Sequence, residues 1–170
     1  IFSFHETVKL PSEEFKHLLV GQCNLRKTLI QLIDFEIAEA GAGRPASIVL
    51  KINSLQDEEM IEKLYAASQA GVKIELNIRG ICSLIAGKKS LSENIKAFSI
   101  VDRFLEHSRI FLFHHGGQEK MYLASADWME RNLSFRIETA FPIYDPVLMA
   151  EIKDILAIQR SDNVKARSLN

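Results

Sequence analysis

A histidine and an arginine stand two residues apart in the segment EHSR, at His107 and Arg109, directly before the apolar run IFLF. Histidine can act near neutral pH as a nucleophile or as a general acid or base. Arginine binds phosphate oxygens through a planar fork of donors. The pair is therefore either two surface residues at the start of a strand or part of a site that binds phosphate.

A hydroxyl and a carboxylate follow the next strand-like run. A Gly-Gly pair separates IFLF from KMYLASAD, which predicts an antiparallel hairpin. If its turn centres near Gly117, Arg109 lies opposite Ser125 and His107 lies opposite Asp127. The serine could donate to a phosphate oxygen, and the carboxylate could orient the imidazole through its other nitrogen. We therefore count Ser125 and Asp127, with His107 and Arg109, among the candidate phosphate-binding residues.

Three further polar residues lie at the ends of two other predicted strands. Lys51 and Asn53 share a face near the end of SIVLKIN, and Arg79 directly follows VKIELNI. Ligands of parallel sheets gather at the carboxyl ends of the strands, which makes these residues candidates for binding phosphate. An arginine at a strand end is more often a solvated residue or an ion-pair partner. Each of these three residues is therefore weak evidence for a phosphate site when taken alone.

The histidines and cysteines outside EHSR do not form a metal site. His114 and His115 flank the Gly-Gly turn, and we interpret them as exposed loop histidines because no other ligand accompanies them at a suitable spacing. Cys23 and Cys82 lack a CxxC spacing, which argues against a zinc site and against a disulfide framework. We expect no metal ligands in this chain, and a location in the reducing cytoplasm.

The elements that would position these residues alternate between helix and strand. Asn24 and Asp57 or Ser54 stand where helix caps are expected, and the first two strands are joined by a helix, as a parallel crossover requires. We therefore predict an α/β domain with one mixed β-sheet flanked by helices. The predicted helices are 25–41, 57–70 and 146–160, and the predicted strands are 47–53, 72–78, 95–101, 109–114, 120–126 and 134–143.

Composition restricts the class of protein further. The 170 residues are 47% hydrophobic and 25% charged, which is typical of one globular domain, and no apolar run is long enough for a membrane-spanning helix. With a formal net charge of -1, a bound anion needs a local basic cluster, and a role in coating nucleic acid is disfavoured. Because the chain starts with Ile1, we expect an excised piece of a longer protein.

RGICSL, FLEHSR and SADW, in this order, resemble the last domain of bacterial polyphosphate kinases. The resemblance covers nearly the whole chain after about Phe15, which places a domain at 16–170 and a linker or the end of a preceding domain at 1–15. That family belongs to the phospholipase D fold, whose signature has a lysine where Arg109 stands and an asparagine where Asp127 stands. These two departures argue against hydrolysis of phosphodiesters and agree with the kinase branch.

The resemblance implies reversible transfer of the terminal phosphate of ATP to polyphosphate, through a phosphohistidine in a preceding domain that this chain does not contain. It implies that His107 lines the site as a candidate acid or base and that Arg79 binds nucleotide or phosphate. It also implies Mg²⁺ with ligands outside this chain, and the preceding domains as partners beside ATP, ADP and polyphosphate. The full-length chain would form a homo-oligomer, in the cytoplasm or in a membrane-associated complex.

Two other functions stay open at this point. The chain could be a phospholipase D-like diesterase or nuclease in which two copies each supply one histidine, although the arginine at position 109 argues against it. It could also be a non-catalytic module that binds polyphosphate. In the leading hypothesis the isolated domain binds phosphate chains weakly and does not turn over.

Overall fold

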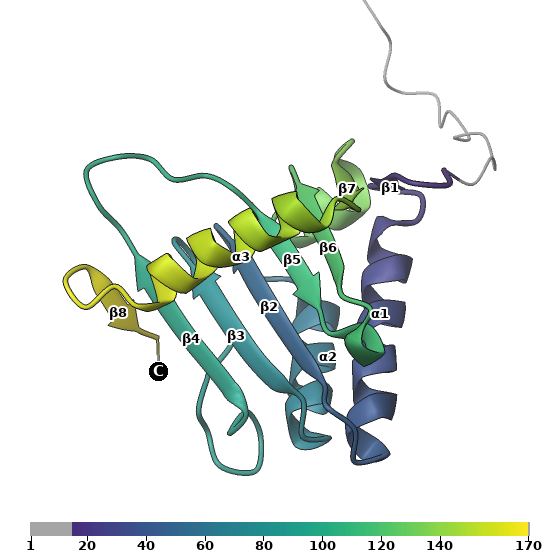
Figure 1. The fold of residues 1–170 in the computed structure, drawn as a ribbon, viewed down its shortest axis with the longest axis horizontal. Coiled ribbons are helices and arrows are strands. Elements are labelled where there is room, and N and C mark those ends of the chain that lie inside the picture. Colours follow the sequence, from purple (N-terminus) through teal and green to yellow (C-terminus); the bar gives the residue numbers. More distant parts are fainter. Residues whose placement is uncertain (1–14, 170) are drawn as a thin grey trace, which may run out of the picture.

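A mixed β-sheet forms the centre of the molecule in the computed structural model, which describes residues 15–169 (Figure 1). The strand order is β1-β7-β6-β5-β2-β3-β4-β8; β2, β3 and β4 run parallel, and the other neighbouring pairs are antiparallel. In chain order the elements are β1 (Leu19–Val20), α1 (Leu25–Gly41), β2 (Ser47–Ile52), α2 (Glu58–Gln69), β3 (Lys73–Ile78), β4 (Ile95–Ile100), β5 (Ile110–Phe113), the 3₁₀ turn η1 (His115–Gly117), β6 (Lys120–Ala124), the π turn η2 (Arg131–Phe135), β7 (Thr139–Ile143), α3 (Pro146–Arg160) and β8 (Ala166–Ser168). The predicted α/β class is confirmed, while the predicted segment 1–15 lies outside the described residues except for Phe15.

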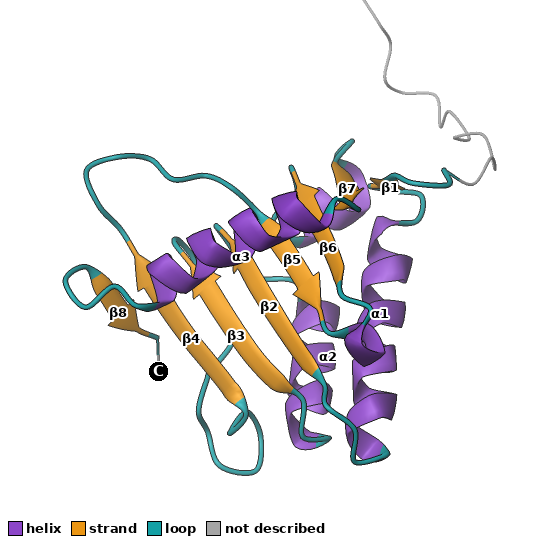
Figure 2. Ribbon diagram, viewed as in Figure 1, coloured by secondary structure: helices purple, strands orange, loops and turns teal. Residues whose placement is uncertain are grey.

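The helices cover the sheet from both sides. α1 and α2 lie side by side on one face, and α3 crosses the opposite face (Figure 2). Alternate residues of β2 reach these two layers: Ile48 and Leu50 belong to the large core under α1 and α2, whereas Val49 packs with the cluster that contains Leu156 of α3. This two-sided burial explains why the β2 sequence is almost continuously apolar.

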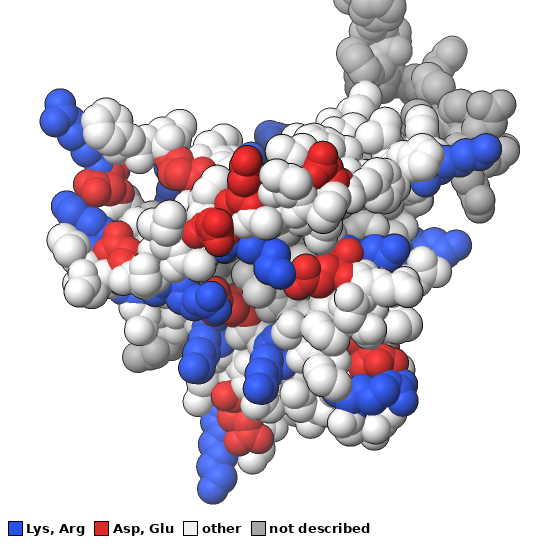
Figure 3. Space-filling view, viewed as in Figure 1, with Lys and Arg blue, Asp and Glu red and all other residues white. Residues whose placement is uncertain are grey.

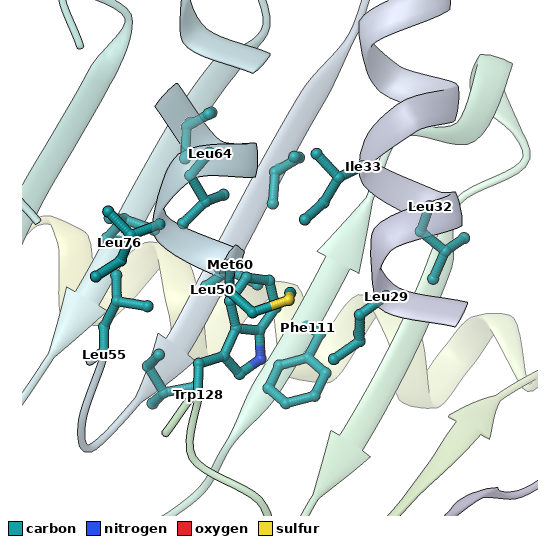
Figure 4. Packing of buried hydrophobic residues seen from close by; sticks show 14 of the residues in the cluster. Leu29, Leu32, Ile33, Leu50, Leu55, Met60, Leu64, Leu76, Phe111 and Trp128 are labelled. Atoms are coloured by element: carbon teal, nitrogen blue, oxygen red, sulfur yellow. The ribbon is translucent and has the colours of Figure 1, made fainter. Parts of the chain in front are cut away.

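Trp128 lies at the centre of the larger core. It is fully buried, and its ring meets that of Phe111 edge to face with 5.7 Å between the centroids. Leu50 and Met60 pack around it between the sheet and the helices (Figure 4). The carbonyl of Trp128 also accepts hydrogen bonds from the backbone amides of residues 56 and 57, at 2.9 and 3.0 Å. Through these hydrogen bonds the backbone of Trp128 fixes the segment on which Asp127 lies.

Asp57 begins α2 and joins it to α1. Its side chain accepts a hydrogen bond from the amide of Met60 at 3.2 Å, as an N-cap does. Both of its carboxylate oxygens also accept from Arg26 of α1, at 2.7 and 2.6 Å. The expected cap is confirmed for Asp57. Asn24 differs, because its side chain bonds the backbone of Val20 and Leu18 instead of capping α1.

The register of the β5–β6 hairpin differs by one residue from the prediction. Ile110 pairs with Leu123, and the amide of Ala124 donates to the carbonyl of Arg109 at 3.1 Å. Arg109 therefore lies opposite Ala124, not Ser125, and the predicted pairing of His107 with Asp127 is wrong because both lie beyond the ladder. The cause is the turn, where three consecutive residues, 115–117, have positive φ and widen the loop.

The predicted strand 134–143 is shorter than expected. β7 contains only Thr139–Ile143; residues 134 and 135 belong to η2, and 136–138 lie in neither a helix nor a strand. Side-chain contacts stabilise this turn: Arg26 donates to Ser134 at 2.9 Å, and Asn132 donates to Glu138 at 2.7 Å. The short edge strands β1 and β8 were not predicted from the sequence.

Charged side chains of both signs are interspersed over the face that carries α3 (Figure 3). This distribution agrees with the formal net charge of -1. Within residues 15–169, no helix is long and apolar enough to cross a membrane.

Asp57→Ala should lower the free energy of unfolding by about 2 kcal/mol, because α2 loses its cap and Arg26 loses a bidentate partner. Urea unfolding measures the change. Asp34→Ala is the matched control: it removes an exposed carboxylate that pairs with Lys63 of α2, and should cost less than about 0.5 kcal/mol. Equal losses in the two variants would contradict the assigned role of Asp57.

Candidate functional site

The carboxylate of Asp127 organises the polar cluster at the end of β2. Its Oδ1 accepts from the backbone amides of Asn53 and Ser54 at 2.7 and 3.3 Å, and from the side-chain amide of Asn53 at 3.3 Å. Arg109 adds a bidentate ion pair, with Nε 3.0 Å from Oδ1 and Nη2 3.1 Å from Oδ2. Asp127 is only 8% exposed, so these donors take the place of water.

The same contacts set the protonation state of Asp127. Burial alone would raise the pKa of this carboxyl, but the hydrogen bonds from Arg109 and from the amide of Asn53 outweigh it and hold the pKa below its usual value of 3.8. Asp127 is therefore charged throughout the neutral range.

Arg109 links Asp127 to His107. Its Nη2 lies 3.2 Å from Nε2 of His107, and its Nη1 donates to the carbonyl of His107 at 3.3 Å. Because a guanidinium can only donate, Nε2 of the neutral imidazole accepts in this geometry, and the ring proton is assigned to Nδ1. The exposed ring of His107 is thus oriented by an arginine that is itself held by a buried carboxylate.

Arg79 joins the cluster through Asn53. Its Nε donates to Oδ1 of Asn53 at 3.0 Å, so that one amide side chain contacts both Arg79 and Asp127. The next residue is a glycine for a steric reason: a Cβ on Gly80 would lie 2.9 Å from the carbonyl oxygen of Asn53. Within residues 15–169, no acceptor bonds Nη1 or Nη2 of Arg79, which leaves these donors for an anion.

Lys51 lies beneath the segment that carries His107. It is 5% exposed, and its ammonium donates to the carbonyl of Ser108 at 3.0 Å and forms an ion pair with Glu106. A cavity of about 70 Å³ lies beside this pair and is lined by Lys51, Asn77, Arg79, Ile100, Glu106 and Gln159. The ammonium group is thus engaged within the protein.

Ser125 belongs to a neighbouring network. Its hydroxyl donates to the carboxylate of Glu138 and accepts from the amide of Thr139 at 3.1 Å, while Glu138 also accepts from Asn132. The structure therefore brings His107, Arg109, Asp127, Asn53 and Arg79 into one chain of contacts, with Lys51 and Ser125 at its borders. Glu138 and Asn132 were not among the site residues predicted from the sequence. The only signal was that Glu138 is a single acidic residue within a predicted strand.

The cluster does not fit a resident Mg²⁺ ion. Both oxygens of Asp127 accept from Arg109, whose positive charge opposes a second cation. Within residues 15–169, no three His, Cys, Asp or Glu side chains converge as metal ligands. His114 and His115 are half-buried, not exposed as predicted, because the turn lies against α1, where the ring of His115 packs on Phe35 with 4.0 Å between the centroids.

Comparison with known proteins identifies close relatives of the chain. Residues 18–170 match the family model described as polyphosphate kinase C-terminal domain 2. The chain is 47% identical over 170 residues to the polyphosphate kinase of Escherichia coli strain K12, a match that covers 100% of the chain and 25% of that protein. Identity to the polyphosphate kinase of Vibrio vulnificus strain YJ016 is 51% over 157 residues, covering 92% of the chain and 22% of that protein.

Solved structures show the same relationship. The crystal structure of polyphosphate kinase from Porphyromonas gingivalis superimposes with a TM-score of 0.91 at 47% identity, over 95% of this chain and 24% of that one. The phospholipase D family member Nuc from Salmonella typhimurium superimposes with a TM-score of 0.63 at 15% identity, over 90% and 97% of the two chains, a likeness of fold alone. The expected phospholipase D-like fold is confirmed. The chain spans about a quarter of the length of the polyphosphate kinases that it matches.

Asp127→Asn should lower the free energy of unfolding by about 2 kcal/mol near neutral pH, because hydrogen bonds to a charged group are lost. Because the pKa of Asp127 is lower in the folded than in the unfolded state, its ionisation stabilises the fold at pH values above the unfolded-state pKa of 3.8. This stabilisation is lost as the pH falls through the folded-state pKa. The difference between wild type and variant should therefore shrink below about pH 4. Urea unfolding at several pH values checks this.

The control for this titration is Asp154→Asn, which changes an exposed carboxylate on α3. Its effect on the free energy of unfolding should stay below about 0.5 kcal/mol at every pH. A wild-type advantage over Asp127→Asn that grows as the pH falls would contradict the assigned ion pair.

Proposed function

Because this chain belongs to the polyphosphate kinase family as its C-terminal domain 2, we propose that it forms one wall of an ATP and polyphosphate site in a longer protein. The reaction is the reversible transfer of the terminal phosphate of ATP to polyphosphate, through a phosphohistidine in a preceding domain. Residues 16–170 are the domain that contributes this wall. Alone it binds phosphate chains but does not complete the reaction.

The contacts of Asp127 and Asn53 carry this proposal. They hold two guanidinium groups, Arg79 and Arg109, at the same end of the sheet, with the exposed imidazole of His107 beside them. Phosphoryl transfer spreads negative charge over the equatorial oxygens of the moving group, and fixed cations stabilise it without reorganising. Arg79 presents its two Nη groups to the phosphates, while Arg109 orients His107.

His107 acts in this scheme as an acid or base. With Nε2 accepting from Arg109, the Nδ1 proton of His107 can be donated to a phosphate or leaving-group oxygen. Lys51, Asn53, Ser125 and Asp127 were also predicted to bind phosphate. Their polar atoms instead bond other protein groups, so in this proposal they support the residues that contact the ligand.

The two departures from the phospholipase D signature contact each other. Arg109 stands for the lysine and Asp127 for the asparagine, and the two form the bidentate ion pair. A lysine and an asparagine could not reproduce this geometry, since an ammonium has no planar fork. This pairing supports the kinase function over the phosphodiesterase alternative.

The preceding domains of the longer chain are the proposed partners. Phe104 and Leu105, close to His107 in the sequence, are 80% and 70% exposed, so two apolar side chains near the site are available for contact with another domain. Any Mg²⁺ ligands would come from those domains, because the cluster around Asp127 does not fit the ion. The longer protein is proposed to be homo-oligomeric and to act in the cytoplasm or in a membrane-associated complex.

His107→Ala in the longer protein should lower kcat for ATP-dependent polyphosphate synthesis by about 100-fold or more, the usual contribution of a general acid or base. Conversion of labelled ATP into polyphosphate measures the rate. His114→Ala, at the opposite end of β5, is the matched control and should leave the rate unchanged. Unchanged synthesis by His107→Ala would exclude the proposed role.

Arg79→Ala should raise KM for ATP about tenfold or more, because charge-assisted hydrogen bonds to phosphate are lost. The same assay, with ATP varied at fixed polyphosphate, gives the value. Arg44→Ala removes an exposed arginine that pairs with Glu39 and should leave KM within about twofold. An Arg79→Ala enzyme with normal KM and normal kcat would show that this arginine does not contact the ligand.

A further inference from the structure

The segment that carries His107 is poorly anchored by packing. It joins β4 to β5 as a long arch (Figure 1), and residues 101–108 are all exposed. Near its start, Asp102 pairs with Lys165 at 3.4 Å, but both side chains are about half exposed and such pairs contribute little. Apolar burial therefore does not determine where the imidazole lies, and polar contacts must.

Those contacts converge on Glu106, the residue before His107. Its Oε1 accepts from the amide and the hydroxyl of Ser108 at 3.1 and 2.6 Å, and its Oε2 accepts from Gln159 of α3 at 3.5 Å. Oε2 also pairs with the ammonium of Lys51. Glu106 thus bonds its own segment, α3 and β2.

Lys51 completes the arrangement from the opposite side. It lies on β2, a central strand that is hydrogen-bonded to β3 and to β5. Its ammonium contacts the carboxylate of Glu106 and the carbonyl of Ser108, the residues on either side of His107. One buried cation on a central strand therefore holds both neighbours of the histidine.

We propose that Lys51 and Glu106 are positioning residues, whose ion pair holds the 101–109 segment so that His107 stays against Arg109 for phosphoryl transfer. This inference rests on the proposed function. It assigns Lys51 a role other than the direct phosphate contact expected from the sequence. A phosphate that reached Lys51 would have to displace Glu106 and the Ser108 carbonyl from an ammonium that is nearly inaccessible.

The charge state of Glu106 is consistent with this role. Partial burial would raise the pKa of its carboxyl, but the hydrogen bonds from Lys51 and Ser108 outweigh that effect and lower the pKa. Glu106 is therefore an anion at neutral pH. Without it, Lys51 would be a buried and unpaired cation, which is a costly arrangement.

The test uses Glu106→Gln and Lys51→Met in the longer protein, each in the wild-type and in the His107→Ala background. Each single variant should lower kcat for polyphosphate synthesis about tenfold or more, because a small displacement of a catalytic group is enough. KM for ATP should change less than about twofold, since uniform substrate binding is preserved. In the His107→Ala background, both variants should change kcat less than about twofold, because they act through that histidine.

Hydrogen–deuterium exchange gives a second reading that does not depend on activity. Backbone amides of residues 101–109 should exchange several-fold faster in Glu106→Gln than in wild type, as expected for a segment released from its anchor. The matched control is Asp34→Asn with Lys63→Met, which removes another inter-element ion pair. It should leave kcat and the exchange of residues 101–109 unchanged.

Three results would overturn the inference. A raised KM with normal kcat in Lys51→Met would make Lys51 a phosphate ligand, and equal losses of kcat in both backgrounds would make the effect independent of His107. Unchanged exchange in Glu106→Gln would show that the ion pair does not hold the segment. If His107→Ala alone leaves activity intact, the proposed function fails, and the exchange data still decide whether Lys51 and Glu106 hold the segment.

Discussion

A buried carboxylate that needs donors determines the local structure of this site. Asp127 loses most of its water on folding, and its negative charge must be matched by protein groups at hydrogen-bond distance. The end of β2 supplies two backbone amides, and the residue before β5 supplies a guanidinium. Asn53, held at the same place, in turn holds Arg79. The positions of both arginines therefore depend on one side chain.

The core fixes that side chain in space. Trp128 follows Asp127 directly, fills the space between the sheet and the helices, and bonds the start of α2 through its carbonyl. The carboxylate can move little without disturbing the packing of the fully buried Trp128. Preorganisation of the charged groups is thus a result of hydrophobic packing next to them, as the proposed phosphoryl-transfer site requires.

Much of this arrangement follows from the sequence alone. The apolar run of β2, the helical period of α1 and α2, and the cap at Asp57 predict the layers correctly, and the carboxyl ends of parallel strands correctly place Arg79 near Asn53. The hairpin register did not follow, because three successive residues with positive φ cannot be read from the letters HGG. The convergence of His107, Arg109 and Asp127 was predicted, but the partner of the carboxylate was not: Asp127 was expected against His107, and it binds Arg109 instead.

Other features depend on tertiary contacts that local sequence does not contain. Lys51 reads as a polar residue near a strand end, and only the folded chain shows that the 101–109 segment closes over it. Glu138 reads as part of a strand, and its partners Ser125 and Asn132 lie on two other segments. Buried polar networks of this kind combine residues that are distant in the sequence, so no periodicity of the sequence predicts them.

The separation of these partners along the chain has a consequence for folding. The hydrogen bond between the Asn53 amide and Asp127 joins residues 74 positions apart, and β5, which follows β4 in the chain, pairs beside β2. Contacts of this range require the closure of long loops, so they slow folding relative to the local contacts of the helices. During synthesis, Asn53 and Arg79 emerge from the ribosome well before Asp127. The polar cluster at the end of β2 can therefore be completed only after the segment that carries Asp127 has been synthesised.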